Sequence, residues 1–312
     1  MTDRTFSSAA ILQPAQSERA GIALVFGSAV VWSFGGAIAR FLHIDDSWTV
    51  VFWRCLFAGL FLLGFMLLRD RPKGTVRLFA GMGWPGIAVG LGFATASTCF
   101  IIAISYTTVA NVVLIQAGVP LFAALFAFLF FRERISTFTW GAIAAVMLGV
   151  AIMVSDSLNG QISPLGDALA LMIAIVFAIT TVITRRYTHV RMTPAACFGA
   201  FVAALLAASQ AKSLSVSGSE LALLFVFGAF NLGFGMALFV TGARLLPAAL
   251  AALLGTAETM LAPVWVALLH GEIPQIRTIV GGVFILAALM CYLTVQLKRQ
   301  TRPVSSIVPP AL

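Results

Sequence analysis

Apolar runs long enough to cross a membrane follow one another along almost the whole chain. About twenty consecutive apolar residues span the hydrocarbon core of a bilayer as a helix. Such runs lie at about 20–41, 47–68, 78–101, 107–131, 138–155, 165–185, 194–211, 219–243, 247–270 and 275–297. An unpaired backbone cannot lie in hydrocarbon, and the runs lack the alternation of barrel strands. We therefore expect an all-α integral membrane protein with ten transmembrane helices.

The composition excludes the other broad classes of protein. Of 312 residues, 61% are hydrophobic and 10% are charged, which is far from a soluble, disordered or disulfide-rich domain. The four cysteines lie inside apolar runs without CxxC spacing, so they are expected to be buried thiols rather than metal or redox groups. The first 20 residues lack the apolar core of a signal peptide, so the first run should remain as a membrane helix.

The positive charges predict the orientation. With the N-terminus inside, fifteen of the 19 Lys and Arg residues fall in inner segments, and only Arg40, Lys212 and Arg277 in outer ones. The remaining cation, Arg54, lies within the second run. Short cytoplasmic segments carry such an excess of cations. We therefore interpret the net charge of +8 as a cytoplasmic coat rather than a nucleic-acid site, with 1–19 and 298–312 as cytoplasmic tails.

The two halves of the chain resemble each other. Residues 21–40 align without gaps with 166–185, and residues 103–133 align with 242–272. The first run thus corresponds to the sixth and the fourth to the ninth. Five spans per half is an odd number, so the second repeat (165–297) must be inverted relative to the first (20–155). Inverted repeats are typical of secondary transporters, whose substrate site lies between the repeats near the middle of the membrane.

Several short motifs carry a resemblance to a known family. They comprise an aromatic-glycine stretch in the first run, a second-run motif, and a proline-to-glutamate segment with a following glycine that closes each half: Trp32-Ser33-Phe34-Gly35-Gly36, Arg54-Cys55-Leu56-Phe57-Ala58-Gly59, Pro120 to Arg132-Glu133-Arg134 with Trp140-Gly141, and Gly271-Glu272 with Gly281. Over residues 20–297 the chain resembles the EamA-type ten-helix branch of the drug/metabolite transporter superfamily. It departs from the pattern at Thr259, where the family often has a proline, and at Arg132, where it usually has a glycine.

The resemblance implies a single-chain carrier in the bacterial inner (plasma) membrane. Such a carrier exports amino acids, metabolites or drugs from the cytoplasm by alternating access around a central cavity. The aromatics and the lack of paired internal charges make the exporters of aromatic or other apolar amino acids the most similar members. The implied protein is not an enzyme and needs no cofactor or metal. Its partners are a small-molecule substrate and the lipid bilayer, not nucleic acid, and a monomer is sufficient.

Glu258 is the only acidic residue expected deep inside a span, and Arg54 is the only embedded base. A charge at mid-membrane costs roughly 2.5–3.5 kcal/mol on insertion scales, so such residues usually face a cavity. Glu258 either binds a substrate ammonium or a proton, or stays protonated as a hydrogen-bonding link between helices. Arg54 either meets a substrate carboxylate, pairs with Glu258 or a backbone carbonyl, snorkels to the outer interface, or packs between helices. One acid and one base would complement a zwitterion.

Further candidate substrate-binding residues are polar or aromatic side chains within the apolar runs: Trp32, Thr95, Gln116, Asn231 and Thr256. The four polar ones either hydrogen-bond a solute or bond to helix backbone and neighbouring helices. Trp32 either stacks on an apolar substrate group or packs between helices. Pro120 should bend its helix, because proline removes a backbone donor and clashes with the preceding turn.

Two other functions stay open. An organic-phosphate or nucleotide-sugar carrier would need clustered internal cations, and the single Arg54 is too few. A non-transporting membrane protein, such as a lipid-handling enzyme, would need no shared cavity. The glycine-rich stretches lack the Lys-Ser/Thr of a nucleotide-binding loop, which excludes ATP-driven transport within the chain. Coupling to protons, exchange and passive flow all fit the sequence.

Overall fold

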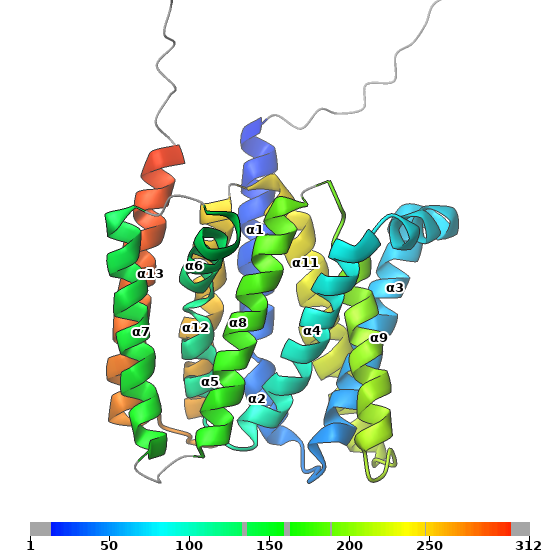
Figure 1. The fold of residues 1–312 in the computed structure, drawn as a ribbon. Helices are drawn as coiled ribbons and strands as arrows, with labels where there is room; N and C mark the ends of the chain where they lie inside the picture. Colours follow the sequence, from blue (N-terminus) through cyan, green and yellow to red (C-terminus); the bar gives the residue numbers. More distant parts are fainter. Residues whose placement is uncertain (1–13, 133–135, 159–162, 188, 247, 301–312) are drawn as a thin grey trace, which may run out of the picture.

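The computed structural model describes residues 14–132, 136–158, 163–187, 189–246 and 248–300, and this part of the chain contains helices and no strand. The long helices run side by side as a bundle (Figure 1). The helix α1 begins and α13 ends at the same end of the bundle, as an even number of crossings requires. We call this the terminal end, and the other, where α2 leads into α3, the opposite end.

The first half of the chain forms α1 to α7. Their bounds are α1 (Pro14–Ser33), α2 (Gly35–Phe41), α3 (Ser47–Ala80), α4 (Gly83–Ile104), α5 (Val109–Gln116), α6 (Val119–Phe131) and α7 (Thr137–Leu158). Two of the runs expected as single helices are interrupted. The first breaks at Phe34, between α1 and α2. The fourth bends by 41° between α5 and α6, directly before Pro120, as the proline predicts.

The second half forms α8 to α13, with one stretch of wider helix. The bounds are α8 (Pro164–Arg186), α9 (Thr193–Gln210), α10 (Gly218–Phe225), the π-helix η1 (Val226–Phe234), α11 (Gly235–Gly242), the short 3₁₀-helix η2 (Ala243–Leu245), α12 (Ala248–His270) and α13 (Ile276–Gln300). The π-helix is continuous with α10 and α11, so the three cross the bundle as one element.

The structure confirms that the chain has membrane spans, but it confirms only part of the predicted number. Among the described residues, seven helical segments are long and apolar enough to cross a bilayer, or eight if the bent pair α5 and α6 is one span. The apolar part of α7, Thr137–Met153, is shorter than this test requires. Helix is present within each of the ten expected runs, but the count of ten spans remains a prediction.

The most extensive packing joins the two halves to each other. The pairs α3 with α9 and α7 with α13 unite elements at equivalent places in the two repeats. The pair α4 with α8 has its counterpart in α11 with α1, and α4 with α9 has its counterpart in η1 with α3. A two-fold relation between two copies of one unit produces this set of contacts.

Glycines allow the closest of these contacts. A Cβ atom on Gly199 of α9 would lie 2.2 Å from the carbonyl oxygen of Gly90 on α4. A Cβ atom on Gly281 of α13 would lie 2.5 Å from the carbonyl oxygen of Gly149 on α7. Small residues that let backbones meet are how helices pack in lipid, where no hydrophobic force drives them together. These glycines therefore hold the two halves in register.

Candidate functional site

Arg54 lies in the interior of the bundle, two turns from the start of α3. Its side chain is buried, and its guanidinium carbon is 4.5 Å from the ring centre of Phe227 and 5.4 Å from that of Phe100. Nε and Nη1 are buried and have no hydrogen-bond partner among the described residues. Snorkelling to the interface therefore does not describe this arginine. A buried cation with free donors is costly unless an anion joins it, so the position suits an anionic ligand group.

Glu258 is half-buried on α12 and interacts electrostatically with Arg54. No ion pair within 4 Å joins the two in the described part of the chain. Ala262 and Trp265 follow Glu258 at intervals of four and three residues and thus share its face of α12. Trp265 Nε1 donates to Ser33 Oγ on α1 at 3.0 Å, so this face is turned toward α1. The structure thus brings the one embedded base and Glu258 into the same region.

Asn231 bonds to the backbone just before the break between α1 and α2. This residue of η1 is buried, and its Nδ2 donates to the carbonyl oxygens of Val31 at 2.5 Å and Trp32 at 3.4 Å. These carbonyls lie in the last turn of α1, which cannot bond onward through the break. From the other side, the ring of Trp265 stacks on Phe34 with centroids 4.6 Å apart. The side-chain amide of Asn231 thus donates its hydrogen bonds to the backbone of α1.

Trp32 packs against the second half of the bundle. Its indole Nε1 is buried without a hydrogen-bond partner among the described residues, and a Cβ atom on Gly235 would lie 2.3 Å from it. The ring centres of Trp32 and Phe239 are 5.4 Å apart. The absence of a side chain at Gly235 is what makes room for the indole. Helix packing accounts for this position of Trp32, and the free N–H leaves one donor for a ligand.

Of the three remaining predicted residues, Gln116 and Thr95 show the bonding typical of polar groups in membrane helices. Gln116 Nε2 donates to the carbonyl of Val112 at 3.2 Å, one turn back on its own helix. Thr95 is exposed, and its hydroxyl donates to the carbonyl of Leu91 at 3.0 Å. Thr256 is buried, and its carbonyl accepts a hydrogen bond from Thr259 Oγ1. No described hydrogen bond links Thr95, Gln116 or Thr256 to Arg54 or Glu258.

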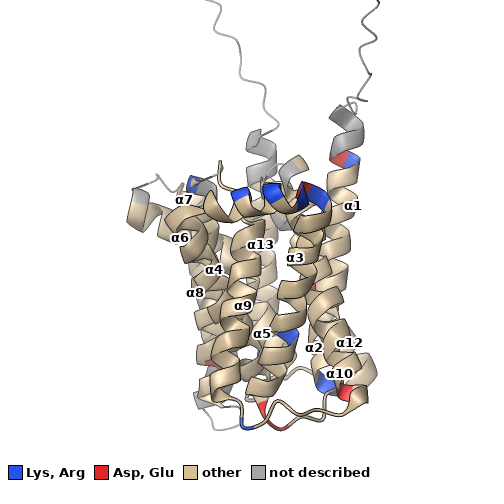
Figure 2. Ribbon diagram, turned by 90° about the vertical axis from the view of Figure 1, so that its right-hand side faces the viewer, with Lys and Arg blue, Asp and Glu red and all other residues tan. Residues whose placement is uncertain are grey.

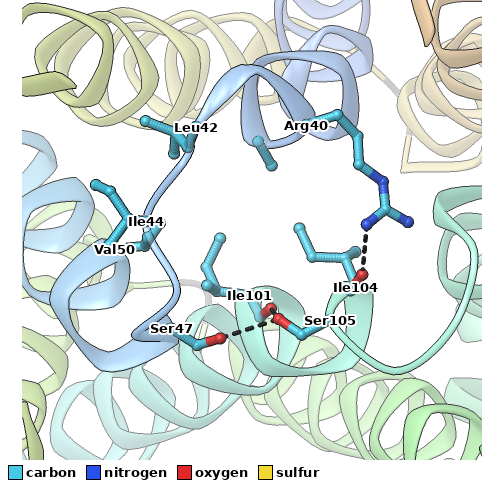
Figure 3. A pocket seen from close by; sticks show the side chains of 9 residues that line it. Arg40, Leu42, Ile44, Ser47, Val50, Ile101, Ile104 and Ser105 are labelled. Carbon is cyan, nitrogen blue, oxygen red and sulfur yellow. Dashed lines mark hydrogen bonds between the residues drawn. The ribbon is translucent and has the colours of Figure 1, made fainter. Parts of the chain in front are cut away.

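A cavity of about 240 Å³ opens between α2, α3 and α4 at the opposite end of the bundle (Figure 3). Its lining is mainly apolar with an arginine and two serines: Ala39, Arg40, Leu42, Ile44, Ser47, Val50, Ile101, Ile104 and Ser105. Val50 precedes Arg54 by one turn on α3, and Ile101 is adjacent to Phe100, which contacts the Arg54 guanidinium. Two lining residues of the cavity are thus near Arg54 or its aromatic neighbour along the helices, although Arg54 itself is not part of the lining.

Arg40, on the wall of this cavity, belongs to a cluster that the sequence did not reveal. Its Nε lies 2.9 Å from Glu272 Oε2, and its Nη1 donates to the carbonyl of Ile104 at 2.8 Å. Glu272 Oε1 in turn accepts from the backbone N–H of Val109 at 2.9 Å. The pair thereby ties α2, α4, α5 and the end of α12 together. Its signals in the sequence were a rare cation in an outer segment and the Gly271-Glu272 motif.

A second buried acid lies at a span end, where the sequence predicted it but did not reveal its burial. Asp167, expected at a span end, is 1% exposed, because the first turn of α8 is covered by neighbouring helices. Its Oδ1 accepts from Thr107 Oγ1 at 3.1 Å and Asn111 Nδ2 at 3.2 Å, and Asn111 Oδ1 accepts from Thr278 Oγ1. Glu133, which aligns with Glu272 in the repeat, lies outside the described residues.

The comparisons with known proteins agree with this architecture. A model of the EamA-like transporter family matches the chain twice, over residues 19–155 and 164–294. Among solved structures 27 chains match, and one, described only as a protein, covers 90% of this chain with 99% of its own at 18% identity and a TM-score of 0.64. That likeness shows the fold alone. No curated protein matches the sequence. Because the family model covers most of the sequence, the chain belongs to the EamA-like transporter family, a family of transporters rather than enzymes.

Proposed function

We propose that this protein is a secondary transporter that exports amino acids with aromatic or other apolar side chains from the bacterial cytoplasm. It works by alternating access between two inverted five-helix repeats (20–155 and 165–297) in the inner membrane, with both termini cytoplasmic. The observation that carries the proposal is the buried Arg54 guanidinium with two free nitrogens.

The chemistry of an α-amino acid complements this site. A carboxylate is a strong acceptor for a guanidinium N–H, and one placed beside Arg54 would accept from the free Nε or the free Nη1. Glu258, on α12 and within electrostatic range of Arg54, is the group that we assign to the substrate ammonium. Phe100 and Phe227 flank the guanidinium and offer aromatic surface to an apolar side chain. One base and one acid thus match the two charges of a zwitterion.

The fold supplies places where alternating access can occur. The break at Phe34, the bend between α5 and α6 and the π-helix η1 are interruptions of regular helix, and the first and third adjoin Asn231. Such interruptions are where membrane helices bend, and π-helices are frequent at functional sites. We infer that the cavity beside Arg40 is the start of a path from the opposite end toward Arg54. In the proposed cycle this path closes when one from the terminal end opens.

The alternative of a phosphate-bearing substrate is less well supported. Organic phosphates and nucleotide sugars need several cations around the phosphoryl oxygens. Arg40 is the cation that lines the cavity, and it is already paired with Glu272. A non-transporting role is disfavoured by the family to which the chain belongs.

Reconstitution in liposomes tests the substrate class. Uptake of a labelled panel of aromatic, aliphatic, acidic and basic amino acids and glucose-6-phosphate is measured with and without a pH gradient. We expect saturable uptake of the aromatic and aliphatic members. A dependence on the pH gradient identifies proton coupling, and its absence identifies passive flow or exchange. Uptake of the phosphate alone, by correctly folded protein, would contradict the proposal.

A further inference from the structure

A basic segment at the terminal end lies outside the proposed substrate path. α3 is interrupted at Arg71, whose backbone has φ 60° and ψ 165°, and Pro72 follows. Beyond this point residues 72–80 continue as helix and turn across the end of the bundle, at the upper right of Figure 1. In Figure 2, Lys and Arg gather along this end of the bundle. The segment therefore lies across the bundle, at the level where the apolar spans end.

The two faces of this segment differ. Thr75 is 4% exposed, and Phe79 packs against the cluster that contains Met66 of the same helix. Lys73, Val76 and Arg77 are exposed, Val76 at 68%. Residues three and four apart share one side of a helix, so these three form a single outward stripe. We call Arg71, Lys73, Val76 and Arg77 the basic ridge.

Among the described residues, the cations of the basic ridge have no carboxylate partner. The neighbouring carboxylate, Asp70, is already paired with Arg69 at 3.2 Å and with Arg191 at 3.0 Å. No carboxylate within 4 Å pairs with Arg71, Lys73 or Arg77 in the part of the chain that the structure describes. The ridge therefore presents uncompensated positive charge beside an exposed valine.

We propose that the basic ridge is a binding site for the headgroups of anionic phospholipids in the leaflet at the terminal end. A helix that lies in the interface with cations on its polar side attracts anionic lipid through charge and through buried apolar area. Lys73 and Arg77 meet the phosphates, and Val76 between them enters the acyl boundary. Leu68, which is 89% exposed one turn before the bend, extends this apolar contact.

The exposed apolar side chains favour lipid over a soluble polyanion. A free phosphate or a nucleic acid would use the cations but gain nothing from Val76 and Leu68. A lipid uses both, because its phosphate and its acyl chain lie next to each other at the depth where the apolar spans end. The lipid also reaches the site without leaving the bilayer.

Native mass spectrometry of the purified full-length protein tests the site. Phosphatidylglycerol or phosphatidylcholine is titrated without any transport substrate, so the result is independent of the proposed function. Each cation near an anionic surface contributes roughly a factor of five in affinity. K73Q/R77Q should therefore bind phosphatidylglycerol about 25-fold more weakly than the unmodified protein, with little change for phosphatidylcholine. The charge-preserving K73R/R77K variant should bind phosphatidylglycerol like the unmodified protein.

The matched control R19Q/K212Q removes two exposed cations that do not belong to the ridge, one near the start of α1 and one at the opposite end, and should retain binding. V76S should weaken binding of phosphatidylglycerol but not of inorganic phosphate. Equal binding by K73Q/R77Q and the unmodified protein would overturn the site, as would equal losses in K73Q/R77Q and R19Q/K212Q. Circular dichroism and size-exclusion chromatography establish that each variant is folded before lipid is added.

Discussion

Arg40 Nε lies 2.9 Å from Glu272 Oε2, and this ion pair joins the end of α2 to the residues that follow α12. The two ion-paired side chains are 31% and 21% exposed, so solvent screens them only in part. Each also bonds to backbone groups at helix ends. Arg40 donates to the carbonyls of Ile104, at the end of α4, and Thr107, and Glu272 accepts from the N–H of Val109, the first residue of α5. These are the backbone groups that a helix leaves unsatisfied at its ends. The pair is thus the centre of a four-element junction beside the cavity.

Replacing Glu272 with Gln should destabilise this junction. The variant keeps the size of the side chain but loses the charge that strengthens both hydrogen bonds, so we expect a loss of about 1–2 kcal/mol in the free energy of unfolding. A double-mutant cycle with R40Q, measured by unfolding in detergent, isolates the pair. Strictly additive effects of the two substitutions would show that the pair contributes nothing of its own.

The contact of Asn231 with α1 gives a second prediction. Asn231→Leu leaves the carbonyls of Val31 and Trp32 without their donor, and we expect a loss of about 1 kcal/mol in stability. Gln116→Leu is the matched control, because the amide of Gln116 bonds a carbonyl on its own helix. Thermal unfolding of both variants measures the difference. A cost for Q116L as large as that for N231L would contradict the assigned role.

Arg71 occupies a backbone region that non-glycine residues rarely adopt. Arg71→Gly and Arg71→Ala remove the same charge, but only glycine adopts this conformation without steric cost. We therefore expect R71G to be more stable than R71A by about 1–2 kcal/mol. Unfolding in detergent at high salt, where charge differences are screened, is the measurement. Equal stabilities would mean that the bend after Asp70 places no strain on position 71.

Asp46 should make stability depend on pH in the acid range. Partial burial raises the pKa of this carboxyl, but hydrogen bonds from the N–H of Lys212, the Thr49 hydroxyl and the N–H of Trp48 together lower it below its ordinary value of 3.8. A lowered pKa stabilises the fold above that ordinary value, and the stabilisation disappears as the pH falls through the folded-state pKa. The advantage of the unmodified protein over D46N should therefore be full near pH 6 and shrink below about pH 4. A thermal-unfolding series that shows a constant difference from pH 3 to 7 would exclude this contribution.

The sequence predicted the helices because hydrocarbon allows few alternatives. Any long apolar run must satisfy its backbone internally, so helix was expected in each of the ten runs, and Pro120 marked the bend between α5 and α6. The break at Phe34 was not predictable in this way. It depends on Asn231, which is about 200 residues distant and bonds the carbonyls that the break exposes. The continuation of α3 to Ala80 was missed because its last turns are charged rather than apolar.

The candidate site, like the fold, was only partly predictable from the sequence. Arg54 and Glu258 were recognisable because charge is rare and costly in an apolar run. Their electrostatic interaction was not predictable, since it depends on how the helices of the two halves are arranged in space. The burial of Asp167 was missed because a residue in the first turn of a helix is usually solvated, whereas here Thr107 and Asn111 cover it. Arg40 and Glu272 were placed in loops, where pairing across the chain has no local signal.

The most direct test of the account is uptake of labelled phenylalanine into liposomes by R54Q beside the unmodified protein. K212Q, which removes an exposed cation at the opposite end, is the matched control. If Arg54 binds the substrate carboxylate, R54Q should lower the uptake rate at subsaturating substrate at least tenfold. K212Q should transport normally, and all three proteins should elute alike on size exclusion. Uptake by folded R54Q at the rate of the unmodified protein would contradict the central claim.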